Sequence, residues 1–213
     1  MTTRVAAGSN ARPKAGRPSS AARERVLMAA YDLFSRQGVR AVGIDTIIAQ
    51  AGVARMTFYH HFPSKDHLVL AFLEKREELW THNWLEAEIR SRAIKSEDRL
   101  LAAFDVLDGW FQREDFEGCS FIKVLLETFE PGDPVRGAAT VHLANVRVFL
   151  RGLAQDAGVA NPDDFARTWQ ILMEGAIVAA GAGDRLAARR ARVVGALFLA
   201  TELQWATKGP QPT

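Results

Sequence analysis

The chain has 213 residues, of which 48% are hydrophobic, enough for a small N-terminal domain and a larger second domain that each have a core. Its one cysteine excludes an internal disulfide and a cysteine-rich metal site, and is typical of a reducing compartment. The N-terminus lacks the apolar stretch of a signal peptide, and the longest apolar run, Val193 to Ala200, is far shorter than the ~18 residues of a membrane helix. We therefore expect a cytoplasmic protein without a membrane partner.

Charge is distributed unevenly along the chain, although the overall formal charge is only +2. Residues 1–65 carry ten Lys or Arg and three acidic residues, whereas the remaining residues carry 17 basic and 22 acidic ones. A basic segment on an acidic body indicates a polyanionic partner such as nucleic acid. On charge alone, a basic tail that only aids solubility is the alternative.

The first 65 residues contain short helical segments separated by turn residues. Residues 1–17 are small, polar and basic, which predicts a flexible arm. Apolar residues at helical spacing predict three helices, over 20–37, 45–51 and 55–61. Gly52 lies in a segment that is long enough only for a tight turn, and Pro63 ends the third helix because proline disfavours a helical residue before it.

The rest of the chain continues with helical periodicity. Ser64 is a good N-cap for a fourth helix from Lys65 to about Arg92, and Asn161 followed by Pro162 is a strong start signal for a later one. Further helices are predicted over 96–111, 119–129, 135–157, 162–181 and 184–207. Since no segment reads convincingly as a strand, we expect an all-α chain of about nine helices.

The second and third predicted helices form a helix-turn-helix, whose second helix enters the major groove of DNA. Arg can read guanine, Thr can contact a thymine methyl group or a phosphate, and Tyr and His commonly reach phosphates. Lys65 begins the fourth helix, where the positive helix N-terminus favours a phosphate. The candidate DNA-binding residues are Arg17, Thr46, Arg55, Met56, Thr57, Tyr59, His60 and Lys65.

The run from Ala41 to Lys65, AVGIDTIIAQAGVARMTFYHHFPSK, resembles the signature of the TetR family, the tetracycline-repressor-like regulators. The resemblance extends back through the Gly-Arg-Pro element and the first helix, and forward to Leu68, about a third of the chain. It implies a two-fold symmetric dimer with a ligand pocket in each C-terminal body. Gly43, Ala54 and Met56 depart from the family pattern, which puts the operator sequence in doubt. A weaker resemblance to one subgroup of these regulators begins at Glu117-Gly118-Cys119.

These patterns divide the chain into a basic arm (1–17), a helix-turn-helix DNA-binding domain (18–64) and a helical ligand-binding and dimerisation domain (65–213). The body is rich in Trp and Phe and has no Arg cluster, which favours a largely apolar, often aromatic effector. The candidate ligand-binding residues are Phe72, Trp80, Trp84, Phe104, Trp110, Phe121 and Trp169.

The last two helices each carry an apolar stripe in addition to residues that can face their own body, which predicts a four-helix bundle between two subunits. The candidate dimer residues are Phe165, Trp169, Leu172, Ala176, Val194, Leu197, Phe198, Thr201 and Trp205.

The sequence therefore predicts a ligand-responsive repressor, without enzymatic activity, that binds a palindromic DNA operator as a homodimer and is released by a small molecule. A helical small-molecule carrier or enzyme without DNA binding is the alternative. A metal is not expected, because the side chains of His60 and His61 point about 100° apart on a helix. No other cofactor is expected either, because Gly181-x-Gly183 lacks the third glycine and the preceding strand of a dinucleotide fingerprint. The Gly16-Arg17-Pro18 element is either a minor-groove arm or only a helix cap. Cys119 is either a redox sensor or a small buried residue.

Overall fold

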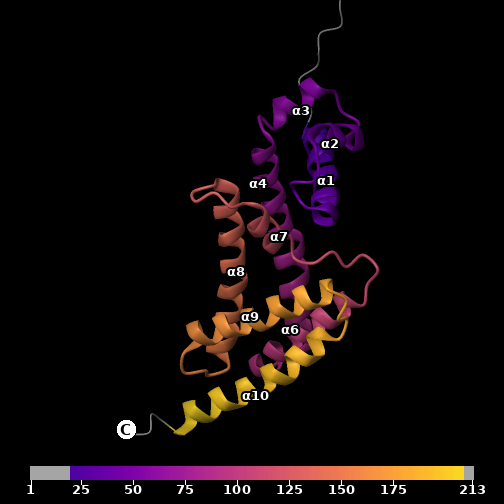
Figure 1. The fold of residues 1–213 in the computed structure, drawn as a ribbon. Helices are drawn as coiled ribbons and strands as arrows, with labels where there is room; N and C mark the ends of the chain where they lie inside the picture. The colour runs from indigo at the N-terminus through magenta and orange to yellow at the C-terminus, as the bar shows by residue number, and fades with distance from the viewer. Residues whose placement is uncertain (1–19, 209–213) are drawn as a thin grey trace, which may run out of the picture.

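The computed structural model describes residues 20–208, and within them every regular element is a helix (Figure 1). The predicted all-α architecture is thereby confirmed. The predicted arm over 1–17, with Arg17, lies outside the described residues.

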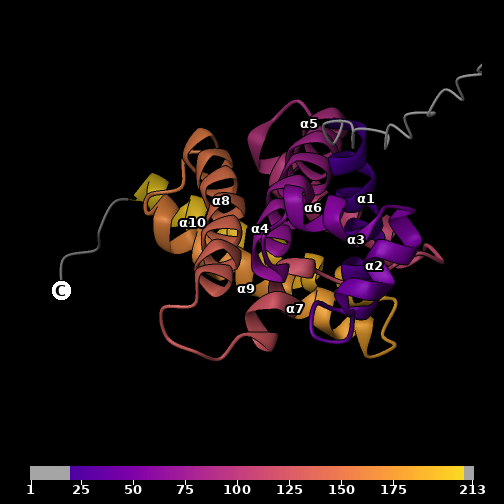
Figure 2. The same cartoon turned by 90° about the horizontal axis from the view of Figure 1, so that it is seen from above.

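Three helices form the N-terminal head: α1 (Ser20–Gln37), α2 (Ile44–Ala51) and α3 (Arg55–His61). Gly52 ends α2 in the left-handed conformation, with φ of 61°, so the chain turns within three residues into α3. Ile47 and Phe58 are fully buried and pack with Phe34 of α1 in one core. Figure 2 shows α2 and α3 beside α1. The predicted helix-turn-helix is therefore present, and its buried side chains belong to the same core as those of the body.

The body begins with one continuous helical rod made of α4 (Lys65–Arg76), the π-helix η1 (Glu77–Glu86) and α5 (Ala87–Arg92). As predicted, Ser64 caps this rod, because its hydroxyl accepts a hydrogen bond from the backbone N–H of His67. The π-helical middle of the rod, in which N–H groups bond five residues back, was not predicted. Counting the rod once, the described residues form nine helices.

The remaining helices of the body are α6 (Ser96–Phe111), α7 (Ser120–Glu127), α8 (Pro134–Asp156), α9 (Pro162–Gly181) and α10 (Ala187–Lys208). The helices α9 and α10 lie at the end of the molecule opposite α3 (Figure 1).

Two of these helices are shorter than predicted. The helix α7 ends two residues early, because the Arg136 guanidinium binds the carbonyls of Leu125 and Thr128. The helix α10 begins three residues late, after Gly183 with φ of 107°.

The head is attached to the body along a seam between α1 and α7. The Glu127 carboxylate accepts hydrogen bonds from the backbone N–H groups of Val39 and Arg40, at 2.8 and 2.9 Å. The Lys123 ammonium donates to the carbonyl of Ser35 at 2.7 Å. Phe72 of α4 packs edge-on against Phe34 at a centroid distance of 5.4 Å. These contacts fix the direction in which the head projects from the body.

Gly38 lies at this seam, and its substitution by Ala is expected to lower the free energy of unfolding by about 2 kcal/mol. Its φ of 82° costs an L-residue about 1 kcal/mol. An added Cβ would also lie 2.1 Å from Oε1 of Glu127, which must then give up part of its hydrogen bonding. Urea unfolding measures the effect.

The matched control is Gly52→Ala, because Gly52 also has a positive φ but no atom within 4 Å of the added Cβ. It should show only the backbone cost. Equal losses in the two variants would mean that Glu127 does not hold the seam.

Candidate DNA-binding face and effector cavity

The helix α3 turns its polar side chains outward because its apolar ones anchor it. Phe58 is fully buried and Phe62 is 2% exposed. Met56 is 84% exposed, and Arg55 and His60 are also exposed. A short helix whose apolar side chains are buried on one face and whose other face is exposed to solvent has the geometry of a recognition helix.

The Arg55 guanidinium is held in place by two neighbours. Its Nη1 lies 2.8 Å from Oδ1 of Asp45 in the first turn of α2, and its Cζ lies 5.8 Å from the centroid of the Tyr59 ring. Both members of the ion pair are largely exposed, so Arg55 can leave Asp45 for a base edge without leaving a buried charge unpaired. Sequence reasoning missed Asp45, because its pairing with Arg55 depends on how the turn brings the two helices together.

The other predicted DNA-contacting residues lie near α3. Thr46 and Tyr59 are exposed, and Thr57 is half-buried. Lys65 is half-buried at the N-terminus of α4, and this burial lowers the pKa of its ammonium group, while Glu127 and Asp66 oppose the shift. Gly43 and Ala54 cap α2 and α3 without a side-chain hydrogen bond. Both helix starts therefore lack the hydroxyl that could also have bound a phosphate.

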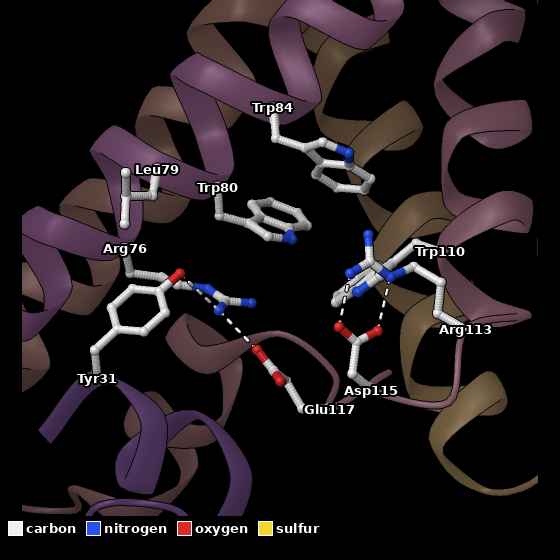
Figure 3. A pocket seen from close by; sticks show the side chains of 9 residues that line it. All are labelled: Tyr31, Arg76, Leu79, Trp80, Trp84, Trp110, Arg113, Asp115 and Glu117. Carbon is white, nitrogen blue, oxygen red and sulfur yellow. Dashed lines mark hydrogen bonds and ion pairs between the residues drawn. The ribbon is translucent and has the colours of Figure 1, made fainter. Parts of the chain in front are cut away.

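A cavity of about 290 Å³ lies between α1, the π-helix and the end of α6 (Figure 3). The structure brings three of the predicted ligand-binding residues together in it: Trp80, Trp84 and Trp110. Their ring centroids are 5.2 to 5.9 Å apart, so the indoles form one continuous aromatic wall. The cavity is lined by Tyr31, Arg76, Leu79, Trp80, Trp84, Trp110, Arg113, Asp115 and Glu117.

The other four predicted ligand-binding residues do not line this cavity. Phe72, Phe104, Phe121 and Trp169 are at most 1% exposed and belong to the main core. Trp169, for example, packs against Phe104 at a centroid distance of 5.1 Å. Helical spacing identifies which residues point inward, but not which of them border an unfilled space, so the ligand contacts of these four residues stay a prediction.

Sequence reasoning missed the charged side of the cavity. Arg76 has a side chain only 5% exposed, and its Nη1 lies 2.7 Å from Oε1 of Glu117. Arg113 and Asp115 form a second ion pair at 2.6 Å, which is more than half exposed. The available signals were an arginine inside an otherwise apolar helix face and the weak Glu117-Gly118-Cys119 resemblance.

Cys119 lies directly after this loop and is 8% exposed. Burial raises the pKa of its thiol, which lowers the fraction of reactive thiolate at neutral pH. Of the two alternatives, the structure favours the small buried residue.

The predicted dimer residues divide into two groups. Val194, Leu197 and Trp205 are 51%, 70% and 64% exposed, and Thr201 of the same stripe is exposed. Phe165, Trp169 and Ala176 are buried within their own subunit, while Leu172 and Phe198 are half-buried.

On α9 the exposed apolar residues are instead Ile171 and Val178, which the sequence did not single out. This corrects the prediction for α9. The two apolar faces of α9 look alike in sequence. The face that carries the aromatic residues packs inward, because the Phe165 ring stacks on the Phe198 ring with their centroids 4.9 Å apart.

Among residues 20–208, no helix is both long and apolar enough to cross a membrane.

Comparison with known proteins gives similar relatives for both parts of the chain. Residues 26–72 match the family described as bacterial regulatory proteins, tetR family. The chain is 37% identical over 113 residues to the HTH-type transcriptional repressor Rv3405c of Mycobacterium tuberculosis, covering 52% of this chain and 58% of that protein. It is 27% identical over 117 residues to the HTH-type transcriptional repressor NemR of Escherichia coli K12, covering 54% and 58%. The matched region thus spans less than two thirds of these relatives.

Among solved structures, SCO4454 from Streptomyces coelicolor, a TetR-family transcriptional regulator, superposes with a TM-score of 0.78 at 27% identity. The superposition covers 86% of this chain and 90% of that one, and therefore includes the body as well as the head.

Proposed function

Since the chain belongs to the TetR family of bacterial regulatory proteins, we propose that it is a transcriptional repressor that binds a palindromic operator as a dimer and is released by a small effector. The observation that carries the proposal is α3, a recognition helix anchored by Phe58 with Arg55, Met56 and Tyr59 exposed on it. The proposal assigns the chain no catalytic activity and places it in the cytoplasm.

The experiment that tests it is a gel shift with the DNA that flanks the protein's own coding region. A palindromic segment should be shifted, while a scrambled segment of equal length and composition should bind far more weakly, as expected for specific over non-specific binding. Equal affinity for the two DNAs would contradict the proposed repressor and favour a non-specific basic surface.

The substitution Arg55→Ala is expected to relax sequence preference at one position of the operator. A bidentate arginine contact to guanine contributes about 1–3 kcal/mol of discrimination, and Asp45 already orients the guanidinium in the free protein. Competition gel shifts with operators varied at single positions measure the preference. Lys65→Ala is the control, because removing a cation that binds phosphate should weaken cognate and scrambled DNA alike. If Arg55→Ala also weakened both equally, its base-reading role would be refuted.

The substitution Leu197→Glu is expected to shift the protein from dimer to monomer. Leu197 is 70% exposed and lies on the α10 stripe with Val194 and Trp205, so an apolar surface would be buried only by a second subunit. A carboxylate buried there without a partner opposes association. Sedimentation at micromolar concentration measures the state. Ile94→Glu is the control, because Ile94 is 92% exposed but lies between α5 and α6. A wild-type protein that sediments as a monomer would contradict the proposed dimer.

A further inference from the structure

The cavity beside α1 contains a buried cation that is shared between head and body. The Arg76 guanidinium uses one nitrogen, Nη1, to donate to Glu117 at 2.7 Å, to the Tyr31 hydroxyl at 3.1 Å and to the Ser35 hydroxyl at 3.3 Å. Figure 3 shows another nitrogen of the Arg76 guanidinium in the space below the Trp80 ring, with no dashed line to a neighbouring side chain. The guanidinium therefore offers N–H donors to that space.

A second donor borders the same space. Nε1 of Trp80 is buried and has no hydrogen-bond partner, which is costly unless a partner binds. The two carboxylates of the cavity already accept hydrogen bonds, Glu117 from Arg76 and Asp115 from Arg113. The buried group without a partner at this site is therefore a donor, which a hydrogen-bond acceptor would satisfy.

The charged side chains that line the cavity are balanced, with Arg76 and Arg113 opposite Asp115 and Glu117. Lys123 lies close enough to Glu117 and Arg76 for both to affect its pKa, which burial lowers. Glu127 also acts on Lys123, so the groups around the cavity carry no excess of negative charge that would exclude an anion. The apolar contribution comes from the indole wall, which offers flat faces for an aromatic ring.

We propose that this cavity binds a one- or two-ring aromatic carboxylate. This class of molecule is then the effector of the repressor, an assignment that rests on the function proposed above. The ring packs against the indoles of Trp80, Trp84 and Trp110, and the carboxylate accepts from Arg76 and Nε1 of Trp80. A volume of about 290 Å³, just below the ~300–1,000 Å³ of ligand pockets, limits the ligand to small ring systems.

Such a ligand would act on the head directly, because Arg76 joins α4 to α1. A carboxylate that binds the other guanidinium nitrogen draws the group toward the indole wall, and this lengthens the weaker hydrogen bonds from Nη1 to the hydroxyls of Tyr31 and Ser35. It also repels Glu117. Both effects weaken the attachment of α1 to the body, and a ligand that prefers the weakened state shifts the protein toward it.

Titration calorimetry of the full chain without DNA tests the ligand class. The probes are naphthoate, the neutral naphthamide and the cationic naphthylmethylamine, which share one ring system. Naphthoate should bind, with the amide roughly tenfold weaker, the contribution of one charge-assisted hydrogen bond, and the amine weaker still. Absence of naphthoate binding, or tighter binding of the amine, would overturn the proposal.

The substitution Glu117→Gln tests whether the site prefers an anionic ligand. It removes a carboxylate next to the site while keeping an acceptor for Arg76, so naphthoate should bind roughly fivefold more tightly. Weaker binding by a variant with wild-type circular dichroism would refute an anionic ligand.

Trp80→Phe and Trp84→Phe form a second, matched test, since both replace an indole of the wall. The distinguishing feature is that the Trp80 N–H is buried without a partner. Trp80→Phe should therefore lose several-fold more affinity for naphthoate than Trp84→Phe, and equal losses would show that Nε1 of Trp80 does not bind the carboxylate.

Gel shifts with and without naphthoate separate this proposal from the proposed function. Naphthoate should release the operator at concentrations near its dissociation constant. If the ligand binds by calorimetry but DNA stays bound, the effector role is refuted and the binding site stands. If the free protein binds no DNA, the proposed repressor fails, and calorimetry still decides whether the site binds aromatic carboxylates.

Discussion

Arg76→Met is expected to lower the free energy of unfolding by about 3–5 kcal/mol, the effect of breaking a buried ion pair by removing one partner. The side chains of Arg76 and Glu117 are only 5% and 20% exposed, so the substitution leaves a carboxylate largely buried without its cation. The hydroxyls of Tyr31 and Ser35 lose the same donor. Methionine retains much of the aliphatic volume, so a packing defect contributes little.

Urea unfolding followed by circular dichroism measures this loss. Arg113→Met is the matched control, because Arg113 and Asp115 form a closer ion pair that is more than half exposed and should contribute little. The double variant Arg76→Met with Glu117→Leu should recover part of the stability, since it removes the uncompensated charge. A single variant as stable as the Arg113 control would show that solvent reaches the Arg76–Glu117 pair.

DNA affinity is expected to fall roughly 10³-fold or more between about 50 and 200 mM salt, as it does for proteins that neutralise six or more phosphates. Residues 1–65 carry ten basic side chains, and a dimer presents two such heads. Each phosphate that a Lys or Arg neutralises releases counterions, so the logarithm of the affinity falls linearly with the logarithm of the salt concentration.

Gel-shift titrations at several salt concentrations measure the slope for operator and scrambled DNA. Lys65→Ala should reduce the slope by about one unit for each phosphate that is no longer neutralised. Both subunits of a dimer carry the substitution, so each subunit that loses a contact adds its own reduction. Glu74→Ala is a control on α4 outside the recognition face, and should leave the slope unchanged. A flat salt response in the wild type would contradict an electrostatic contribution from the head.

The fold was largely predictable from the sequence because its signals are local. Ser64, and Asn161 with Pro162, mark the starts of α4 and α9, and both caps form the expected hydrogen bonds. Phe58 and Phe62 recur at helical spacing, and both are buried. Such signals depend on residues a few positions apart, so they survive in any tertiary arrangement that buries the apolar faces.

The proposed effector cavity was predictable only in part because it depends on contacts between distant segments. The residues of its aromatic wall, Trp80, Trp84 and Trp110, were predicted because large aromatic residues are easy to pick out in the sequence. Its polar side combines Tyr31, Arg76 and Glu117, which lie 41 or more residues apart in sequence and meet only in the folded chain. No local pattern predicts which apolar residues border a void and which fill the core.

The π-helical segment Glu77–Glu86 affects how this chain should be aligned with its relatives. A turn closed by bonds to the fifth preceding residue holds more residues than an α-helical turn, so a helical wheel drawn with one period from Lys65 to Arg92 loses its phase inside the rod. Ile89, which is fully buried after this segment, would then be assigned to the wrong face relative to Phe72 before it. An alignment to a relative with an uninterrupted α-helix therefore needs a gap within the helix, at a place where gap penalties usually forbid one.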